Sequence, residues 1–377
     1  MSQPKSTRRS FLRGGAAVEA LAAWADGAAV ETRLAEPIGD GYLVEFSRQA
    51  MATTFQVLLN ARQYPQGADA AVAALDAIEA LENQLTVYRQ HSEVMHINRE
   101  AYAGPVAVES RLFELFEQAA RLHGETQRAF DITAGPLAKV WGFYRRQGAI
   151  PSTDDLATAL DRVGMRHVLL DADAESVQFA IDGVEINLGA IGKGYALDRA
   201  AELLGAAGVE DFVLHGGASS VLARGSRNSG HARGESSGEA ADGVGTSAAG
   251  WQIGIGDPQR PGERLAMVDL RDRAVGTSGA AFQFFRHQGR RYGHKIDPRT
   301  GWPAEGVLSA TVVAPTAAEA DALSTALYVL GVEEAERLVA QRAGTSAILV
   351  VPAERSGEVR VLAFGFAEGE VSLPGEA

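Results

Sequence analysis

The order of strand-like and helix-like segments is the feature that most constrains the fold. Tyr42–Arg48 and Thr53–Asn60 are rich in β-branched and aromatic residues, and only a short turn separates them. A helical pattern follows over Gly67–Leu85, and Leu112 to Leu122 indicate another amphipathic helix. Strands that follow one another directly, with helices in blocks, favour an α+β fold with mostly antiparallel sheets over a doubly wound parallel sheet.

The second half of the chain continues in the same way. VEINLG (Val184–Gly189) and FVLHGG (Phe212–Gly217) are predicted to be short buried strands on either side of a helix over Gly194–Leu204. Residues 224–250 are a low-complexity segment of Gly, Ser and Ala, which buries too little apolar area to order itself. Because strand-like VLAR and WQIGIGD flank this segment, we expect a disordered hairpin insertion within a single domain over residues 35–377.

The composition excludes several classes of function. The 377 residues carry a net charge of −13, which argues against nucleic acid as a partner. There is no Cys, so disulfides, thiol nucleophiles, Cys-based zinc sites and a lipidated N-terminal Cys are all excluded. An anionic ligand must therefore be held by local cations or by a metal ion.

The N-terminal segment resembles a twin-arginine export signal. Arg8 and Arg9 are followed by Ser10, Phe11, Leu12 and an Ala-rich stretch. A disordered basic tail is the alternative, and Glu19 and Asp26 interrupt the apolar stretch. We expect residues 1–34 to be an export signal and linker.

Two glycine- or hydroxyl-containing segments are candidates for ligand binding. In GAIGKGYALD, Gly189–Asp198, glycines and Lys193 lie between a strand and a helix, where an anion could bind, although a plain strand–helix turn fits equally well. In PTAAEADALSTAL, Thr316 starts a helix near Ala317, which places Asp321 and Thr325 one turn apart on one face. These two side chains suit Mg²⁺, or they are simply solvated polar residues.

Two further segments place polar side chains beside turns. In FDITAGPLAKVWGF, Asp131 and Thr133 either cap a helix or hold a polar edge of a ligand. In RYGHKIDPRTGWP, alternation puts Tyr292, His294 and Ile296 on one strand face and Lys295 on the other. Asp297, Pro298 and Gly301 fit a turn, with Gly301 at a positive φ, whereas His294 is either a core histidine or a general base.

The order of the motifs is more specific than any one of them. MATTFQV, YRQHSEVMHIN, FDITAGPLAKVWGF, NLGAIGKGYALD, HGGA, GTSG, YGHKIDPRTG and APTAAEADALSTAL together resemble the FAD:protein FMN transferases, the ApbE-like flavin transferases. The resemblance runs from about Met51 to Leu330 and implies an ApbE/T-fold-like α+β domain. It also implies that FMN is transferred from FAD to a Thr or Ser hydroxyl of a target flavoprotein, with release of AMP.

The resemblance assigns roles to individual residues. His294 matches the base that takes the proton of the target hydroxyl, and Asp321, Thr325 and the carbonyl of Ala190 match ligands of Mg²⁺. Ser324 stands where many relatives have a further acidic residue. The positions that match the lining of the FAD site are Met51, Tyr88, Ala129, Phe130, Asp131, Asn187, Lys193 and Ile296. Two of the matched segments depart from the family pattern, with Asn187 in place of the usual Asp and Ala52 in place of the usual Gly.

The resemblance and the N-terminal segment together predict the setting of the reaction. An enzyme exported by the twin-arginine route works in the periplasm or on the outer face of the cytoplasmic membrane. Its target is then expected to be a membrane respiratory or electron-transfer flavoprotein with its acceptor hydroxyl on the same side. The oligomeric state does not follow from the sequence. The alternatives are hydrolysis of FAD to FMN and AMP, and an exported protein that binds or delivers FAD without turnover.

Overall fold

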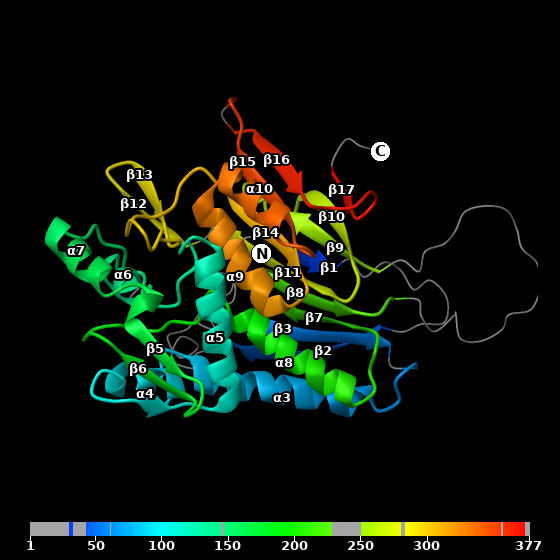
Figure 1. Cartoon of the computed structure of the whole chain (residues 1–377). Helices are drawn as coiled ribbons and strands as arrows, with labels where there is room; N and C mark the ends of the chain where they lie inside the picture. Colours follow the sequence, from blue (N-terminus) through cyan, green and yellow to red (C-terminus); the bar gives the residue numbers. More distant parts are fainter. Residues whose placement is uncertain are drawn as a thin grey trace, which may run out of the picture.

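The molecule consists of three layers built on a large antiparallel sheet (Figure 1). The computed structural model describes residues 30–32, 43–60, 62–144, 147–227, 250–279, 283–355 and 357–373. The large sheet has the strand order β16-β15-β14-β11-β8-β7-β3-β2, and every neighbouring pair is antiparallel. Its strands are β2 (Leu43–Ala50), β3 (Thr53–Asn60), β7 (Phe212–Gly216), β8 (Ser220–Arg224), β11 (Arg273–Gly279), β14 (Ser309–Ala314), β15 (Ser346–Pro352) and β16 (Val359–Phe364). The expected α+β fold with mostly antiparallel sheets is confirmed.

Three smaller sheets complete the strands. The second layer is a four-stranded antiparallel sheet in the order β1 (Val30–Thr32), β9 (Trp251–Gly256), β10 (Arg264–Leu270) and β17 (Val371–Ser372). A three-stranded sheet consists of β4 (Val106–Ala107), β6 (Ser176–Phe179) and β5 (Val168–Asp171). The hairpin of β12 (Phe284–His287) and β13 (Arg290–Gly293) forms a sheet by itself and projects from one side of the molecule.

Helices form the third layer. They are α3 (Gly67–Leu85), α4 (Glu93–Glu100), α5 (Ser110–Glu125), α6 (Gly135–Val140), α7 (Thr153–Asp161), α8 (Gly192–Ala206), α9 (Ala317–Leu330) and α10 (Val332–Gln341), with a 3₁₀ turn at Met165–His167. Alternation along the large sheet separates two cores. Val57 and Leu214 belong to the core beneath the helices, whereas Leu58 and Val213 pack with Trp251 of the four-stranded sheet.

Two predictions about local structure were wrong. VEINLG is not a strand, because side chains and a distant loop satisfy its backbone: Asn98 bonds both Ile186 N and Ile186 O, and Asn187 N donates to the carbonyl of Ile132 at 2.7 Å. The segment between β8 and β9 does not close a hairpin, since β8 lies in the large sheet and β9 in the four-stranded one. Residues 228–249 of this segment lie outside the described residues, so its predicted disorder is not tested. Of residues 1–34, the predicted export signal and linker, the structure describes only β1, so the export signal is not tested either.

Candidate active site

Asp321 of α9 is the buried carboxylate at the centre of the site. Its Oδ2 accepts a hydrogen bond from Gly194 N of α8 at 2.7 Å, and its Oδ1 accepts one from the Ser220 hydroxyl of β8 at 2.7 Å. Burial raises the pKa of Asp321 to about 6, while Lys193, Ser220, Gly194 and Lys295 act to lower it. The carboxylate thus ties the helix layer to the large sheet and meets two ammonium groups.

Hydroxyl groups surround Asp321 on the side of β11. The Ser278 hydroxyl lies 3.0 Å from both Ser324 Oγ and Thr325 Oγ1. Ser324 also donates to the backbone carbonyl of Asp321 at 2.8 Å. Ser324, which was matched to an acidic position, is therefore occupied with neighbouring hydroxyls and with its own helix, while Thr325 faces Lys295, whose Nζ lies 3.4 Å from Thr325 Oγ1.

Two lysines converge on this carboxylate from different elements. Lys193 lies in the first turn of α8 and donates to the Ser219 hydroxyl. Lys295 was predicted to point away from His294, but β13 ends at Gly293, so strand alternation no longer applies at residue 295. For this reason the sequence did not indicate Lys295 as a site residue. The one feature that could have indicated it is the position of a Lys directly after His294.

His294 lies at the base of the β12–β13 hairpin. Its backbone N–H donates to Gln283 O at 3.2 Å, and its Nδ1 lies 3.0 Å from the same carbonyl. Since a carbonyl only accepts, Nδ1 carries the hydrogen and Nε2 carries the lone pair. Burial lowers the pKa of His294 to about 3, with further lowering by Lys295 and Lys193, so the ring is neutral at pH 7. A neutral imidazole with an accepting Nε2 is the form that a general base requires.

A cavity of about 250 Å³ opens beside this cluster. Four of the residues predicted to line the FAD site lie around it: Met51, Tyr88, Asn187 and Lys193. Lys193 is common to the cavity and to the polar cluster, so the cavity is continuous with the charged end of the site. Tyr88 is 74% exposed at the rim, which leaves its ring accessible to a planar ligand.

The wall of this cavity next to Met51 is a strained turn. Met51 and Ala52 connect β2 to β3 with φ values of 50° and 60°. A two-residue hairpin turn with positive φ at both positions is of type I′, which favours Asn and Gly over residues such as Met and Ala, whose Cβ atoms disfavour positive φ. Ala52 therefore adopts a conformation that glycine would adopt without strain.

Asn187 forms the opposite wall. Its Oδ1 accepts from Gly189 N at 2.9 Å, and its Nδ2 donates to the hydroxyl of Tyr144 at 3.0 Å. The Tyr144 ring lies 5.6 Å from the Tyr88 ring. The preceding residue, Phe143, meets the His294 ring edge-on at 6.4 Å. Of the two consecutive aromatic residues after α6, Tyr144 thus contacts Asn187 and Tyr88 of the cavity wall and Phe143 contacts the histidine, which no sequence pattern indicated.

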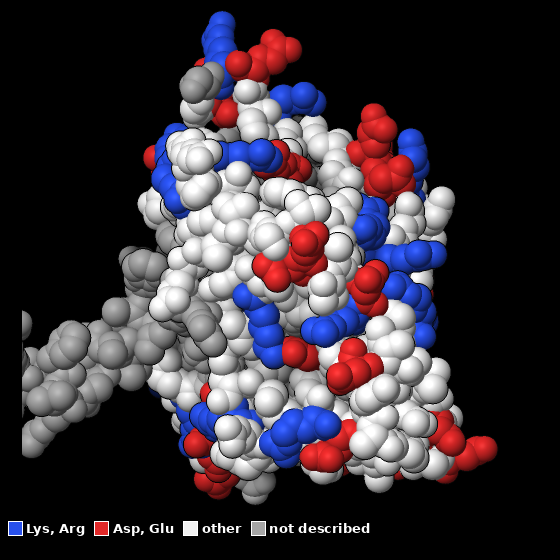
Figure 2. Space-filling model, turned by 90° about the vertical axis from the view of Figure 1, so that its left-hand side faces the viewer, with Lys and Arg blue, Asp and Glu red and all other residues white. Residues whose placement is uncertain are grey.

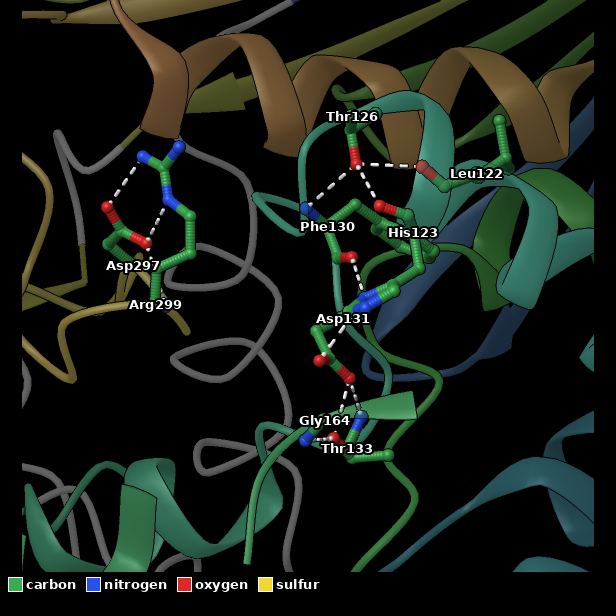
Figure 3. A network of polar contacts seen from close by, with 9 residues as sticks. All are labelled: Leu122, His123, Thr126, Phe130, Asp131, Thr133, Gly164, Asp297 and Arg299. Carbon is green, nitrogen blue, oxygen red and sulfur yellow. Dashed lines mark hydrogen bonds and ion pairs between the residues drawn. The ribbon is translucent and has the colours of Figure 1, made fainter. Parts of the chain in front are cut away.

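Ala129, Phe130 and Asp131 do not line this cavity. Ala129 and Phe130 are buried in the core beneath the helices. Asp131 belongs to a polar network between α5 and α6 (Figure 3), in which its Oδ1 accepts from Thr133 N at 2.8 Å and its Oδ2 lies 3.3 Å from His123 Nδ1. Burial raises the pKa of Asp131, and His123 and Thr133 counter this effect. Asp131 does not cap α6, whose N-cap is Ala134 without a side-chain hydrogen bond, and its role at a ligand stays a prediction.

Ile296 also lies away from the cavity. It packs beside Leu137 of α6 and pairs with Pro303 across the turn. Within that turn Asp297 holds Arg299 through both carboxylate oxygens, as Figure 3 shows, and Gly301 has a φ of 76°. The turn chemistry predicted for this segment is confirmed, and it fixes the start of the stretch that carries His294 and Lys295.

The position of α9 is set by backbone contact. A Cβ at Gly194 would strike the carbonyl of Ala317, and one at Gly276 would strike the backbone of Ala320. Asp198 of α8 then accepts hydrogen bonds from Ala317 N at 2.8 Å and Ala318 N at 2.9 Å, at the start of α9. Burial raises the pKa of Asp198 to about 7, against the lowering effect of these two N–H groups.

The donor set is of the kind that binds Mg²⁺ together with substrate phosphates. The described residues contain no group of three or more His, Asp or Glu side chains placed to hold a metal ion. One carboxylate, Asp321, stands next to the hydroxyl of Thr325, and Ala190 lies just before the start of α8, whose Gly194 contacts Asp321. Mg²⁺ is commonly held in this way, by one or two carboxylates together with water and substrate phosphates, so the residues fit it.

Comparison with known proteins identifies the family. The model of the ApbE family matches residues 51–349. The chain belongs to the ApbE family. It is 34% identical over 327 residues to the FAD:protein FMN transferase of Treponema pallidum, an alignment that covers 82% of this chain and 86% of the relative. Among solved structures, the ApbE protein of Thermotoga maritima has a TM-score of 0.71 at 28% identity and 85% coverage of this chain. The Pseudomonas stutzeri flavinyl transferase ApbE has a TM-score of 0.71 at 25% identity and 87% coverage.

The range that the family model matches contains the site described above. The matched range begins at Met51 of the strained turn and extends past Asp321 and Thr325. The alignments cover 96% of each of the two solved structures, so this chain shares the fold of both over nearly their whole length. In the described part of the chain, no helix has both the length and the apolar character needed to cross a membrane.

Proposed function

We propose that this ApbE-family protein is an FAD:protein FMN transferase that joins FMN from FAD to a Thr or Ser hydroxyl of a target flavoprotein in a Mg²⁺-dependent reaction. The observation that carries the proposal is the convergence of His294, Lys193 and Asp321 at one end of a cavity with aromatic and apolar walls. A dinucleotide with ring systems and a central diphosphate requires that combination. The names of the relatives agree with this activity.

The reaction balances with the residues at hand. The target oxygen attacks the phosphorus of the FMN half, the bond from that phosphorus to the bridging oxygen breaks, and AMP leaves with the bridging oxygen. His294 Nε2 takes the hydroxyl proton. The low pKa of the free enzyme's His294 makes it a weak base, and a bound diphosphate beside it raises that pKa, because a negative charge favours the imidazolium.

The other residues of the site would bind the diphosphate, the metal ion and a ring of FAD. Lys193 and Lys295 face the negative phosphate oxygens, and their ammonium groups orient the diphosphate with respect to His294. Asp321, Thr325 and the carbonyl of Ala190 would hold Mg²⁺, which neutralises charge on the phosphate oxygens when bound. Tyr88 and Met51 would contact a ring of FAD in the cavity.

Release of AMP provides a direct test. The protein is incubated with FAD, Mg²⁺ and a candidate flavoprotein domain, and both AMP and fluorescent flavin-labelled protein are measured. Transfer requires that the two products form together and that Asp321→Ala removes both. AMP that forms at the same rate with and without target would indicate hydrolysis of FAD, and bound FAD without AMP at any metal concentration would indicate a non-catalytic carrier.

We further propose that the protein is exported by the twin-arginine route and acts on a membrane respiratory or electron-transfer flavoprotein in the periplasm or on the outer membrane face. Paired Arg8 and Arg9 support this location. Replacement of both by Lys should leave the protein in the cytoplasm. Continued export of that variant would exclude the twin-arginine route.

A further inference from the structure

The β12–β13 hairpin is a locally basic element in an acidic protein. The net charge of the chain is −13, yet no Asp or Glu occurs from Gln283 to Ile296. The hairpin carries Arg286, Arg290 and Arg291. Figure 2 views the molecule from the side on which the hairpin lies in Figure 1, and Lys and Arg side chains alternate there with Asp and Glu. A negative partner would therefore be attracted by the hairpin and not by this whole face of the molecule.

The two faces of the hairpin have different roles. Phe285 and Tyr292 are cross-strand partners that stack at 5.3 Å and pack against Trp141, so this face attaches the hairpin to the domain. Arg286 and Arg291 are also direct cross-strand partners, and alternation places them on the other face. The two arginines therefore lie on the face opposite the aromatic contact with Trp141.

The arrangement of these two arginines favours an anion. Like charges directly opposite each other across two strands destabilise the pairing. Both guanidinium groups lie near the same ring, with Arg291 4.0 Å and Arg286 5.8 Å from the centroid of Phe284, which is 36% exposed. Within the described ranges Arg286 forms no ion pair, and the nearby Glu305 bonds to Arg290 at 2.6 Å. A carboxylate between Arg286 and Arg291 would relieve their repulsion and form charge-assisted hydrogen bonds.

The hairpin leads directly to the catalytic histidine. β13 ends at Gly293, the residue before His294, and the residue before β12 supplies the carbonyl that orients the His294 ring. We propose that the face formed by Phe284, Arg286 and Arg291 is the docking surface for an acidic segment of the target flavoprotein. A segment that lies along this face delivers its hydroxyl to the base of the hairpin, where His294 stands, so this assignment rests on the proposed transfer reaction.

Binding of synthetic peptides tests the surface without FAD. The probes are a short labelled peptide with one Thr flanked by several Asp and Glu, and the same peptide with Asn and Gln at the acidic positions. Fluorescence anisotropy with the full chain should give an affinity about tenfold higher for the acidic peptide at low salt, and this difference should shrink as salt is added. Equal affinities for the two peptides would overturn the proposal.

Matched variants locate the binding surface. Arg286→Glu with Arg291→Glu should abolish the preference for the acidic peptide, and the milder Arg286→Gln should reduce it while the melting temperature stays unchanged. Arg355→Glu is the control, because Arg355 is 85% exposed in the turn between β15 and β16, and it should keep the preference. Loss in the Arg355 variant, or retention in the hairpin variants, would refute the assignment. Preference for the acidic peptide in a wild-type protein that does not cleave FAD would refute the transferase function alone.

Discussion

The carboxylate of Asp198 gives the chain a stability that depends on pH in a defined window. Asp198 accepts the two N–H groups at the start of α9, the helix that carries Asp321 and Thr325. Burial raises its pKa to about 7, well above the value of about 3.9 for an aspartate in an unfolded chain. Because the native pKa is higher than the unfolded one, the native state binds more protons between these two pKa values. The stability contributed by Asp198 is therefore present at low pH and is lost as pH rises through about 7.

The size of the effect follows from the two pKa values. Between about pH 5 and about pH 8 the unfolded carboxyl stays ionised while the native one loses its proton, which lowers the free energy of unfolding by about 2 to 3 kcal/mol. Asn at this position does not titrate, and like the protonated carboxyl it offers one acceptor oxygen to the two N–H groups. The stability of Asp198→Asn relative to the wild type should therefore rise by about 2 to 3 kcal/mol between about pH 5 and about pH 8, because only the wild type loses stability over this range.

Urea unfolding measures this difference. The free energy of unfolding of both proteins is determined from Trp fluorescence at the two pH values, in the presence of EDTA and without FAD, so that ligand binding does not contribute. Asp173→Asn, an exposed position, serves as the control and should show no such change. The same difference in stability between Asp198→Asn and the wild type at both pH values would mean that Asp198 ionises normally, and the reasoning from burial would fail.

Three further changes probe the active site and its walls. His294→Ala should slow transfer to a protein hydroxyl by about 10²- to 10⁴-fold, and full flavinylation by this variant would remove His294 from the mechanism. Lys295→Met should weaken the binding of FAD but not of riboflavin, which lacks the diphosphate, and equal weakening in fluorescence titrations would indicate a structural role for the lysine. Ala52→Gly should raise the free energy of unfolding by about 0.5 to 1 kcal/mol, because it relieves a positive φ, and a lower melting temperature would contradict the strained turn.

Local signals in the sequence predicted those parts of the structure that local forces determine. The start of α9 follows from Thr316, whose hydroxyl accepts from Glu319 N at 3.3 Å, and the turn at Asp297 and Gly301 follows from their side-chain and backbone preferences. The strand-like composition of both segments and the short turn between them are consistent with the antiparallel pairing of β2 and β3. Each of these features depends on residues within a few positions of one another.

Features that depend on distant partners could not be predicted in this way. The backbone of VEINLG looked like a strand by composition, but the Asn98 side chain, far away in the sequence, satisfies it. Lys295 turns toward Thr325 because its strand ends two residues earlier, a boundary that alternation does not reveal. In each case a tertiary contact decides the outcome.

The close packing of Gly194 and Gly276 against α9 limits which parts of the protein can change in evolution. Side chains at an interface can repack by changing rotamers, whereas main-chain atoms in contact cannot yield without moving a whole helix or strand. Asp321 and Thr325 are therefore carried by a helix whose position is fixed by backbone contact, and substitutions away from this contact leave their spacing unchanged. Among the strands that the structure describes, β12 and β13 pair only with each other, and this hairpin can accept new side chains on its exposed face. One enzyme scaffold of this kind can acquire new protein targets by mutation of a few hairpin residues while its chemistry stays the same.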